Sequence, residues 1–212
     1  MNKQPIILIG GGGHCISCID VIEQTRQYEI IGILDQPEKE GTNVLGYPVI
    51  GSDDDLERMA KDCPNFHITV GQIKSPKIRH SIYTKVKRAG GILPVISSPT
   101  AYVSQHAKID EGTIIMHQAF VNAAASVGRC CIINSKALIE HEASIGDFCH
   151  ISTATCINGQ VSVGGNSFIG SNTVVSNNLS VSENTIVAAG SQVLKSIYHS
   201  GIYIGNPLRK IR

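Results

Sequence analysis

The most regular feature of the chain is an aliphatic residue at every sixth position through its second half. Valine or isoleucine fills all sixteen positions, and the residue two places before each is usually small, most often alanine. A period of six matches neither an α-helix nor an ordinary strand, which repeat at 3.6 and 2 residues. The positions are Val103, Ile109, Ile115, Val121, Val127, Ile133, Ile139, Ile145, Ile151, Ile157, Val163, Ile169, Val175, Val181, Val187 and Val193.

This hexad predicts a parallel β-helix, in which each repeat supplies one short strand and one turn. Three hexads close one triangular coil, so residues 18 apart in the sequence stack on one another and the aliphatic side chains fill the interior. Sixteen hexads give about five coils. Because the series has no break, we expect no large loop to leave the prism.

The first 97 residues have a different pattern, in which short apolar strands alternate with helices. This alternation predicts a parallel sheet and a Rossmann-like domain. The chain is therefore expected to have two domains, an α/β domain over 1–97 and an all-β helix over 98–212. The expected strands are 5–9, 29–34, 67–70 and 92–96, and the expected helices are 15–27, 53–62 and 76–90.

Composition and charge exclude several classes of protein. The formal net charge is +1, which does not indicate a nucleic-acid partner. The apolar run Ile6–Ile9 is too short for a signal peptide or a membrane span, so a cytoplasmic location is expected. All seven cysteines are interpreted as thiols. Cys15 and Cys18 form a C-x-x-C pair, which fits either a redox role or simple packing of a helix on a sheet.

His141 is the first candidate for chemistry, because the 18-residue coil places it at a turn directly beneath Gly159. A neutral imidazole beside a carboxylate, here Glu142, is the usual equipment of a general base. The other interpretation is an ordinary surface histidine on a turn. By the same spacing Ser171 lies beneath Ala189 on another corner.

Metal binding is the next alternative. The γ-type carbonic anhydrases, which share the β-helix, hold zinc with histidines spaced five apart. The nearest pairs here, His106 with His117 and His141 with His150, are eleven and nine apart, so no metal is predicted.

The glycine run Gly10–Gly13 follows a strand and opens a helix, an arrangement that favours a phosphate group. It is an incomplete dinucleotide fingerprint, since Cys15 stands where the third glycine belongs. Asp35, at the end of the second strand, fits either a contact to a ribose or base edge or a plain turn residue.

Taken together, these motifs resemble the NeuD/PglD-type sugar acyltransferases of bacteria. The resemblance rests on Gly10–His14, Asp35 and Gly71 before the hexads, and on Asn134, Ile139–Glu142, His150 and Gly205–Pro207 afterwards. It implies a left-handed β-helix, acetyl-CoA as the acyl donor, and a homotrimer with active sites between neighbouring prisms.

The resemblance also implies roles for particular residues. His141 would be the general base and Glu142 the group that raises its basicity. The acetyl-CoA contacts would be His150, Gly159, Ser171 and Ala189. The nucleotide-sugar contacts would be Gly12, Gly13, His14, Asp35, Gly71 and Asn134. Gln36, Gln72 and Ala189 depart from residues common in the family, and the first two leave the nucleotide and the sugar in question.

The leading functional prediction is therefore N-acetylation of a UDP-linked 4-amino-4,6-dideoxy sugar for a bacterial surface glycan or glycoprotein. O-acetylation of sialic acid or another sugar hydroxyl is the close alternative. A non-catalytic β-helix that binds nucleotide sugars is the alternative from a different class.

Overall fold

The computed structural model describes residues 3–212, which form two compact units. The first unit contains the chain up to Gly71 together with Lys77–Ser97. The second contains Ser98–Arg212 and also the short segment Gln72–Pro76, called here the 72–76 segment. This segment therefore belongs to the second unit, although the residues on both sides of it belong to the first.

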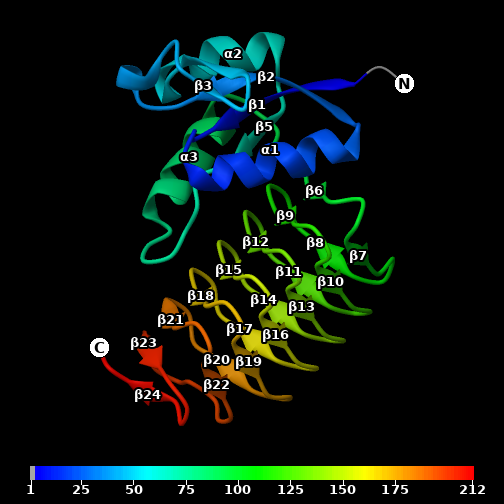
Figure 1. The fold of residues 1–212 in the computed structure, drawn as a ribbon, viewed down its shortest axis with the longest axis vertical. Helices are drawn as coiled ribbons and strands as arrows, with labels where there is room; N and C mark the ends of the chain where they lie inside the picture. The colour runs from blue at the N-terminus through cyan, green and yellow to red at the C-terminus, as the bar shows by residue number, and fades with distance from the viewer. Residues whose placement is uncertain (1–2) are drawn as a thin grey trace. The chain divides into compact units, whose positions relative to one another are not determined.

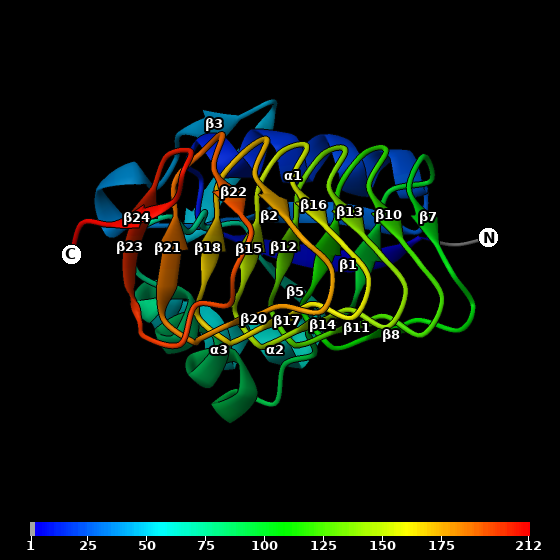
Figure 2. The ribbon, with the colours of Figure 1, turned by 90° about the horizontal axis from the view of Figure 1, so that it is seen from below.

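A five-stranded sheet in the order β3-β4-β2-β1-β5 forms the centre of the first unit. Its strands β4, β2, β1 and β5 are parallel, and β3 runs antiparallel to β4 at the edge. Helix α1 lies on one side of the sheet and α2 and α3 lie on the other (Figure 2). The elements are β1 (Gln4–Ile9), α1 (Gly13–Thr25), β2 (Tyr28–Leu34), the 3-10 turns Pro37–Lys39 and Asp53–Asp55, β3 (Asn43–Val44), β4 (Tyr47–Gly51), α2 (Leu56–Asp62), β5 (Phe66–Ile68), α3 (Lys77–Arg88) and β6 (Ile96–Ser97).

The central strand β1 is apolar along most of its length because it pairs with a strand on each edge and is covered on both faces. Ile6, Ile7, Leu8 and Ile9 are each at most 1% exposed. Such a continuous apolar run is typical of parallel sheets, whose helices cover both faces. The predicted Rossmann-like architecture is confirmed.

Two details of the predicted sheet are wrong. The expected strand over 92–96 is absent, and Ile92 forms only an isolated bridge to Asn65 before the two-residue strand β6. Pro94 explains the difference, since proline has no N–H to donate to a ladder. Strand β4 was not expected, because Pro48 lies inside it and glycines stand at its borders.

The second unit is a β-helix in which each strand pairs in parallel with the strand three places later. Val121 lies opposite Ile139, and Ile139 lies opposite Ile157, so the register is 18 residues, as predicted. The coils follow one another in chain order from β7 to β22 (Figure 1).

The strands of the β-helix form three faces. The first face has β7 (Tyr102–Val103), β10 (Phe120–Val121), β13 (Leu138–Ile139), β16 (Cys156–Ile157), β19 (Val174–Val175) and β22 (Gln192–Val193). The second has β8 (Lys108–Ile109), β11 (Ser126–Val127), β14 (Ser144–Ile145), β17 (Ser162–Val163) and β20 (Ser180–Val181). The third has β9 (Ile114–Ile115), β12 (Ile132–Ile133), β15 (His150–Ile151), β18 (Phe168–Ile169), β21 (Thr185–Val187), β23 (Gly201–Ile204) and β24 (Arg209–Lys210).

The hexad aliphatics form the core of this unit. From Ile115 to Val193 every one of them is at most 3% exposed. Val103 and Ile109, in the first coil, are only partly buried. The core is thus a continuous stack, and each coil depends on its neighbours for burial.

The turns between strands share one backbone feature that the sequence analysis did not anticipate. The residue three places after each aliphatic has a positive φ in twelve consecutive hexads, from Gln118 (φ 59°) to Asn184 (φ 55°). Only four of the twelve are asparagine, the side chain that tolerates this region best. The closed coil, rather than local preference, therefore determines these turns.

Replacing a stacked aliphatic is expected to destabilise the second unit strongly. Ile157→Ala removes a fully buried side chain, and such a change costs about 3 kcal/mol through lost transfer energy and a cavity. Urea unfolding at fixed protein concentration measures this loss. The exposed Ser162→Ala on the next strand is the control and is expected to change stability by less than about 0.5 kcal/mol. Equal effects of the two changes would contradict the stacked core.

Candidate functional site

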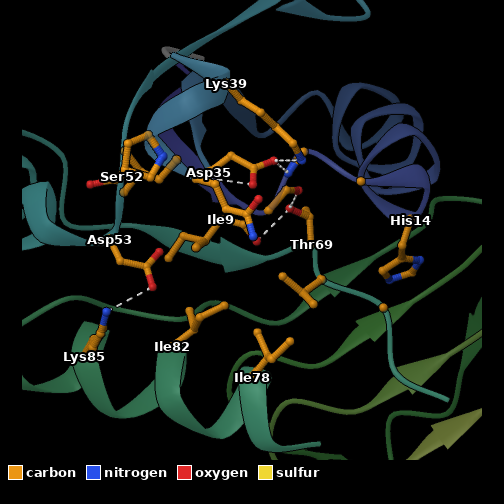
Figure 3. A pocket seen from close by; sticks show the side chains of 18 of the residues that line it. Ile9, His14, Asp35, Lys39, Ser52, Asp53, Thr69, Ile78, Ile82 and Lys85 are labelled. Atoms are coloured by element: carbon orange, nitrogen blue, oxygen red, sulfur yellow. Dashed lines mark hydrogen bonds and ion pairs between the residues drawn. The ribbon is translucent and has the colours of Figure 1, made fainter. Parts of the chain in front are cut away.

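A pocket of about 750 Å³ lies in the first unit, at the carboxyl ends of β1, β2 and β5 (Figure 3). Its volume is within the usual range of small-molecule sites. The sequence-predicted residues Gly12, Gly13, His14, Asp35 and Gly71 all line it. The structure therefore brings together all the predicted nucleotide-sugar contacts except Asn134, which lies in the β-helix.

The glycine run forms one wall of this pocket. Gly10 has φ 105°, which only glycine adopts readily, and its carbonyl accepts a 2.6 Å hydrogen bond from the Thr69 hydroxyl. Gly12 caps α1, and no atom lies within 4 Å of where a Cβ on Gly12 or Gly13 would stand. The helix N-terminus is thus open to the pocket, and a helix N-terminus suits a phosphate group.

Asp35 connects the ends of β1 and β2. Its carboxylate accepts hydrogen bonds from the N–H of Gly11 (2.7 Å), the N–H of Gln36 (2.8 Å) and the ammonium of Lys39 (2.9 Å). Burial by itself would raise the pKa of this carboxyl, but the three hydrogen bonds outweigh burial and hold the pKa below its ordinary value. Asp35 is therefore ionised and orders the glycine loop as well as facing the pocket.

The pocket also contains charged residues that the sequence analysis did not single out. Lys39 pairs with Asp35, and Lys85 lies 3.2 Å from Asp53 (Figure 3). Ile78 and Ile82, from α3, supply an apolar wall. Lys39 was detectable, because it follows Asp35 at the i,i+4 spacing of an ion pair. Lys85 and Asp53 lie 32 residues apart, and no local pattern connects them.

Buried titratable groups beneath the pocket do not suit chemistry. His67 is fully buried, and burial together with Arg79 and His14 lowers its pKa to about 3, so the ring is neutral. Cys15 and Cys18 are also fully buried, and burial raises the pKa of both thiols. A redox role needs an accessible thiolate, so the structure favours the packing interpretation of this cysteine pair.

His141 and Glu142 form a pair at a corner of the β-helix. The Nδ1 atom of His141 lies 3.2 Å from Oε2 of Glu142, and both side chains are about half exposed, 54% and 55%. Neighbouring strand residues would point to opposite faces, but Glu142 has φ 58°, and this turn allows the contact. An ionised carboxylate only accepts hydrogen bonds, so Nδ1 is protonated and the Nε2 lone pair is free to accept a proton.

Gly159 stands beside the Nε2 atom of His141, as the 18-residue register predicted. A Cβ at position 159 would lie 2.6 Å from Nε2. Glycine therefore leaves room for the imidazole itself, which a side chain at position 159 would displace. The Glu142 carboxylate is held from the same coil as Gly159, by the Gln160 amide at 3.1 Å.

The other predicted acetyl-CoA residues lie at two further places on the β-helix. Ser171 bonds to the Ser152 hydroxyl (2.8 Å), and the N–H of Gly190, next to Ala189, donates to the Ser171 carbonyl. His150 is only 8% exposed. Its Nε2 atom lies 3.1 Å from the amide nitrogen of Asn134, and its Nδ1 atom lies 2.6 Å from the carbonyl oxygen of Gln72.

A second pocket of about 450 Å³ lies at the C-terminal end of the β-helix. Lys195, His199 and Lys210 line it together with Tyr198 and Tyr203. Two ammonium groups beside aromatic rings suit an anionic group attached to a ring. Within residues 3–212 no cluster of three His, Cys, Asp or Glu side chains is placed to hold a metal ion. No helix of that range is long and apolar enough to cross a membrane.

Comparisons with known proteins show what the chain is similar to. Residues 5–86 match the model of the PglD N-terminal domain. The whole chain superimposes on PerB from Caulobacter crescentus, a perosamine N-acetyltransferase solved with CoA and GDP-perosamine, with a TM-score of 0.92 and 27% identity over 100% of this chain and 99% of PerB. These similarities support a sugar acetyltransferase of the PglD/NeuD type.

Two further structures are similar over the whole chain. The acetyltransferase domain of PglB from Neisseria gonorrhoeae FA1090, in complex with acetyl coenzyme A, gives a TM-score of 0.90 at 25% identity, covering 99% of this chain and 100% of that domain. WeeI from Acinetobacter baumannii AYE is 20% identical, with a TM-score of 0.87 and coverage of 99% and 100%, and shares the fold. No curated protein matches the sequence. The comparisons bear out the predicted resemblance to this family, and they confirm the left-handed β-helix and the acyltransferase class.

Gly159→Ala is expected to reduce acyl transfer while leaving the fold intact. The added methyl group would overlap Nε2 of His141, and the half-exposed imidazole can swing away without straining the core. We expect kcat to fall at least about tenfold, and the Tm to change by less than about 2 °C. Steady-state kinetics and thermal unfolding measure the two effects, with Ser162→Ala as control. Full activity of Gly159→Ala would show that Nε2 is not the reacting nitrogen.

Proposed function

We propose that the protein transfers an acetyl group from acetyl-CoA to the amine of a nucleotide-linked amino sugar. The observation that supports this most directly is the half-exposed His141–Glu142 pair, with the Nε2 atom of His141 beside Gly159. A pocket with a helix N-terminus in the other unit supplies the second requirement, a place for a nucleotide diphosphate. PerB binds CoA and GDP-perosamine, and the PglB domain binds acetyl coenzyme A.

In the proposed reaction His141 acts as the general base. Its Nε2 atom takes a proton from the sugar amine while the amine nitrogen bonds to the thioester carbonyl carbon. The C–S bond then breaks, and the proton is passed to the departing thiolate. Glu142 holds the Nδ1 proton and stabilises the imidazolium. Because both side chains are half exposed, the pair contributes little to stability, and its role is orientation.

The two units divide the substrates in this proposal. Gly12, Gly13, His14, Asp35 and Gly71 hold the nucleotide sugar, with the N–H groups of α1 on its phosphates. For the β-helix we propose acetyl-CoA contacts at its corners, at Gly159, Ser171 and Ala189. His150, the fourth predicted position, is 8% exposed, and its two ring nitrogens already face Asn134 and Gln72. We also propose the cytoplasmic location that the sequence analysis expected.

The proposal also includes the identity of the nucleotide that carries the sugar. The sequence analysis predicted a UDP-linked 4-amino-4,6-dideoxy sugar, and this stays a prediction. PerB was solved with a GDP-linked sugar, so GDP-linked amino sugars are the first competitors.

A panel of acceptors tests the function. The release of free CoA is measured with acetyl-CoA and UDP- or GDP-linked 4-amino sugars, and with sialic acid as the hydroxyl acceptor. We expect release with an amino sugar and transfer to its nitrogen. Release with hydroxyl acceptors alone would make the protein an O-acetyltransferase, and no release with any acceptor would contradict the proposal.

Replacing the base tests the mechanism. His141→Ala is expected to lower kcat about 10²-fold or more, because a general base typically contributes that much. His106→Ala, at another exposed turn of the β-helix, is the matched control and is expected to leave kcat unchanged. A His141→Ala enzyme with normal kcat would contradict the role of His141 as general base.

We propose a homotrimer formed through the first face of the β-helix. The outward residues on this face are mostly apolar, and Tyr102, Phe120 and Val174 are 54%, 38% and 38% exposed. Tyr102 and Phe120 stack with ring centroids 4.6 Å apart. The second face instead has a column of serines after Lys108. Contiguous exposed apolar surface marks an interface. In a cyclic trimer each chain buries the same surface against its neighbours, so no apolar face is left exposed.

Charge on the apolar face is expected to break the trimer. Leu138→Glu places a carboxylate in the middle of the outward apolar residues of the first face. The mass measured by light scattering should then fall to that of one chain, 22.7 kDa, from about three times that value. Ser144→Glu makes a similar change on the second face and should keep the larger mass. Dissociation by Ser144→Glu but not by Leu138→Glu would assign the interface to the other face.

A further inference from the structure

The tautomer of His150 follows from its two partners. The carbonyl oxygen of Gln72 only accepts, so the Nδ1 atom of His150 donates the hydrogen of the 2.6 Å bond. Asn134 uses its Oδ1 atom to accept from the N–H of Ser135 at 2.8 Å, so its amide nitrogen faces Nε2 of His150 as a donor. His150 is therefore a neutral ring that donates in one direction, toward Gln72.

Gln72 is held at two points. Besides its carbonyl bond to His150, its side-chain amide donates to the Phe148 carbonyl at 2.6 Å. Gln72 is 3% exposed, whereas the next residues, Ile73 and Lys74, are exposed. Gln72 is thus the buried residue through which the 72–76 segment attaches to the β-helix.

The residues just before Gln72 form part of the acceptor pocket. Val70 and Gly71 line it, and a Cβ on Gly71 would lie 3.4 Å from the Cβ of His14. Upstream, the Thr69 hydroxyl donates to the Gly10 carbonyl, and the buried Arg79 guanidinium donates to the Val70 carbonyl. Side chains of the first unit therefore hold the chain around Val70. Two residues later, Phe148 and His150 of the β-helix bond to Gln72.

We propose that His150 is a positioning residue for the acceptor pocket. By holding the Gln72 carbonyl it fixes the end of the loop that Gly71 contributes to that pocket. This inference depends on the proposed function in one respect, namely that the ligand of the pocket is a nucleotide sugar. It gives His150 a role in nucleotide-sugar binding that is separate from the acetyl-CoA contact implied by family resemblance.

Two amide substitutions separate these roles. In His150→Asn the amide nitrogen stands as many bonds from Cβ as Nδ1 does, so a donor toward Gln72 is kept. In His150→Gln the amide nitrogen stands where Nε2 does, so that donor is lost. Both variants lose the ring and its edge contact to Phe168, at 5.2 Å between centroids, so packing losses are matched.

Calorimetry with each ligand alone tests the proposal. We expect His150→Gln to raise the Kd for the nucleotide sugar about tenfold and His150→Asn to raise it less than about threefold, the range that one hydrogen bond provides. The probes are GDP-perosamine and a UDP-4-amino-4,6-dideoxy sugar. The Kd for CoA should stay within about twofold in both variants. Weaker CoA binding with unchanged nucleotide-sugar binding, or equal effects of Asn and Gln, overturns the proposal.

Hydrogen–deuterium exchange gives a readout that needs neither ligand nor activity. Uptake in the peptide over residues 69–76 should rise in His150→Gln and stay near wild type in His150→Asn. Gln72→Met keeps the carbonyl but loses the bond to Phe148, and it should raise uptake in the same peptide even if His150→Gln folds poorly. Unchanged uptake in both His150→Gln and Gln72→Met overturns the proposal. If the wild-type protein binds neither nucleotide sugar, the proposed function is contradicted instead. The exchange measurement then still tests whether His150 anchors Gln72.

Discussion

The stacking of one buried aliphatic residue on another, coil after coil, is the constraint on which the second unit depends. No single coil buries its own hydrophobic residues, because each has only two strand residues on a face and needs coils above and below. The stack therefore fixes the register of every strand at 18 residues. A slip by one residue would turn the aliphatics outward, so the register has no nearby competitor.

That register also determines where chemistry is found. A positive φ at each turn is an energetic cost for residues such as Glu142, and the packed coils on both sides impose it. In return, the turn directs Glu142 toward the adjacent His141, which a straight strand cannot do. The same stacking sets Gly159 beside Nε2 of His141. The imidazole, its carboxylate partner and the glycine beside it are thus placed together by the repeat itself.

The sequence predicted what depends on periodicity and missed what depends on distant partners. The hexads gave the β-helix, its register and the place of His141, because each signal lies within one or two coils. The glycine run and Asp35 were found from their positions at strand ends. Strand β4 was missed because Pro48 lies inside it and made the segment look like a turn. A strand at 92–96 was wrongly predicted because the apolar pattern there outweighed Pro94, which interrupts the strand in the structure. The bond between Gln72 and His150 joins residues 78 apart, and no spacing rule reaches that far.

His141 and His150 show why burial and partners, rather than residue type, assign a role. The two histidines lie nine positions apart on the same β-helix, and both matched the family. His141 is 54% exposed and uses only Nδ1, so its second nitrogen is free for a proton. His150 is 8% exposed and uses both nitrogens, one as donor and one as acceptor. To act as a base, the Nε2 atom of His150 would have to give up its bond from Asn134. Once protonated, Nε2 would face the Asn134 amide nitrogen, which is itself a donor. The geometry therefore supports a base at His141 and a positioning role at His150, as proposed.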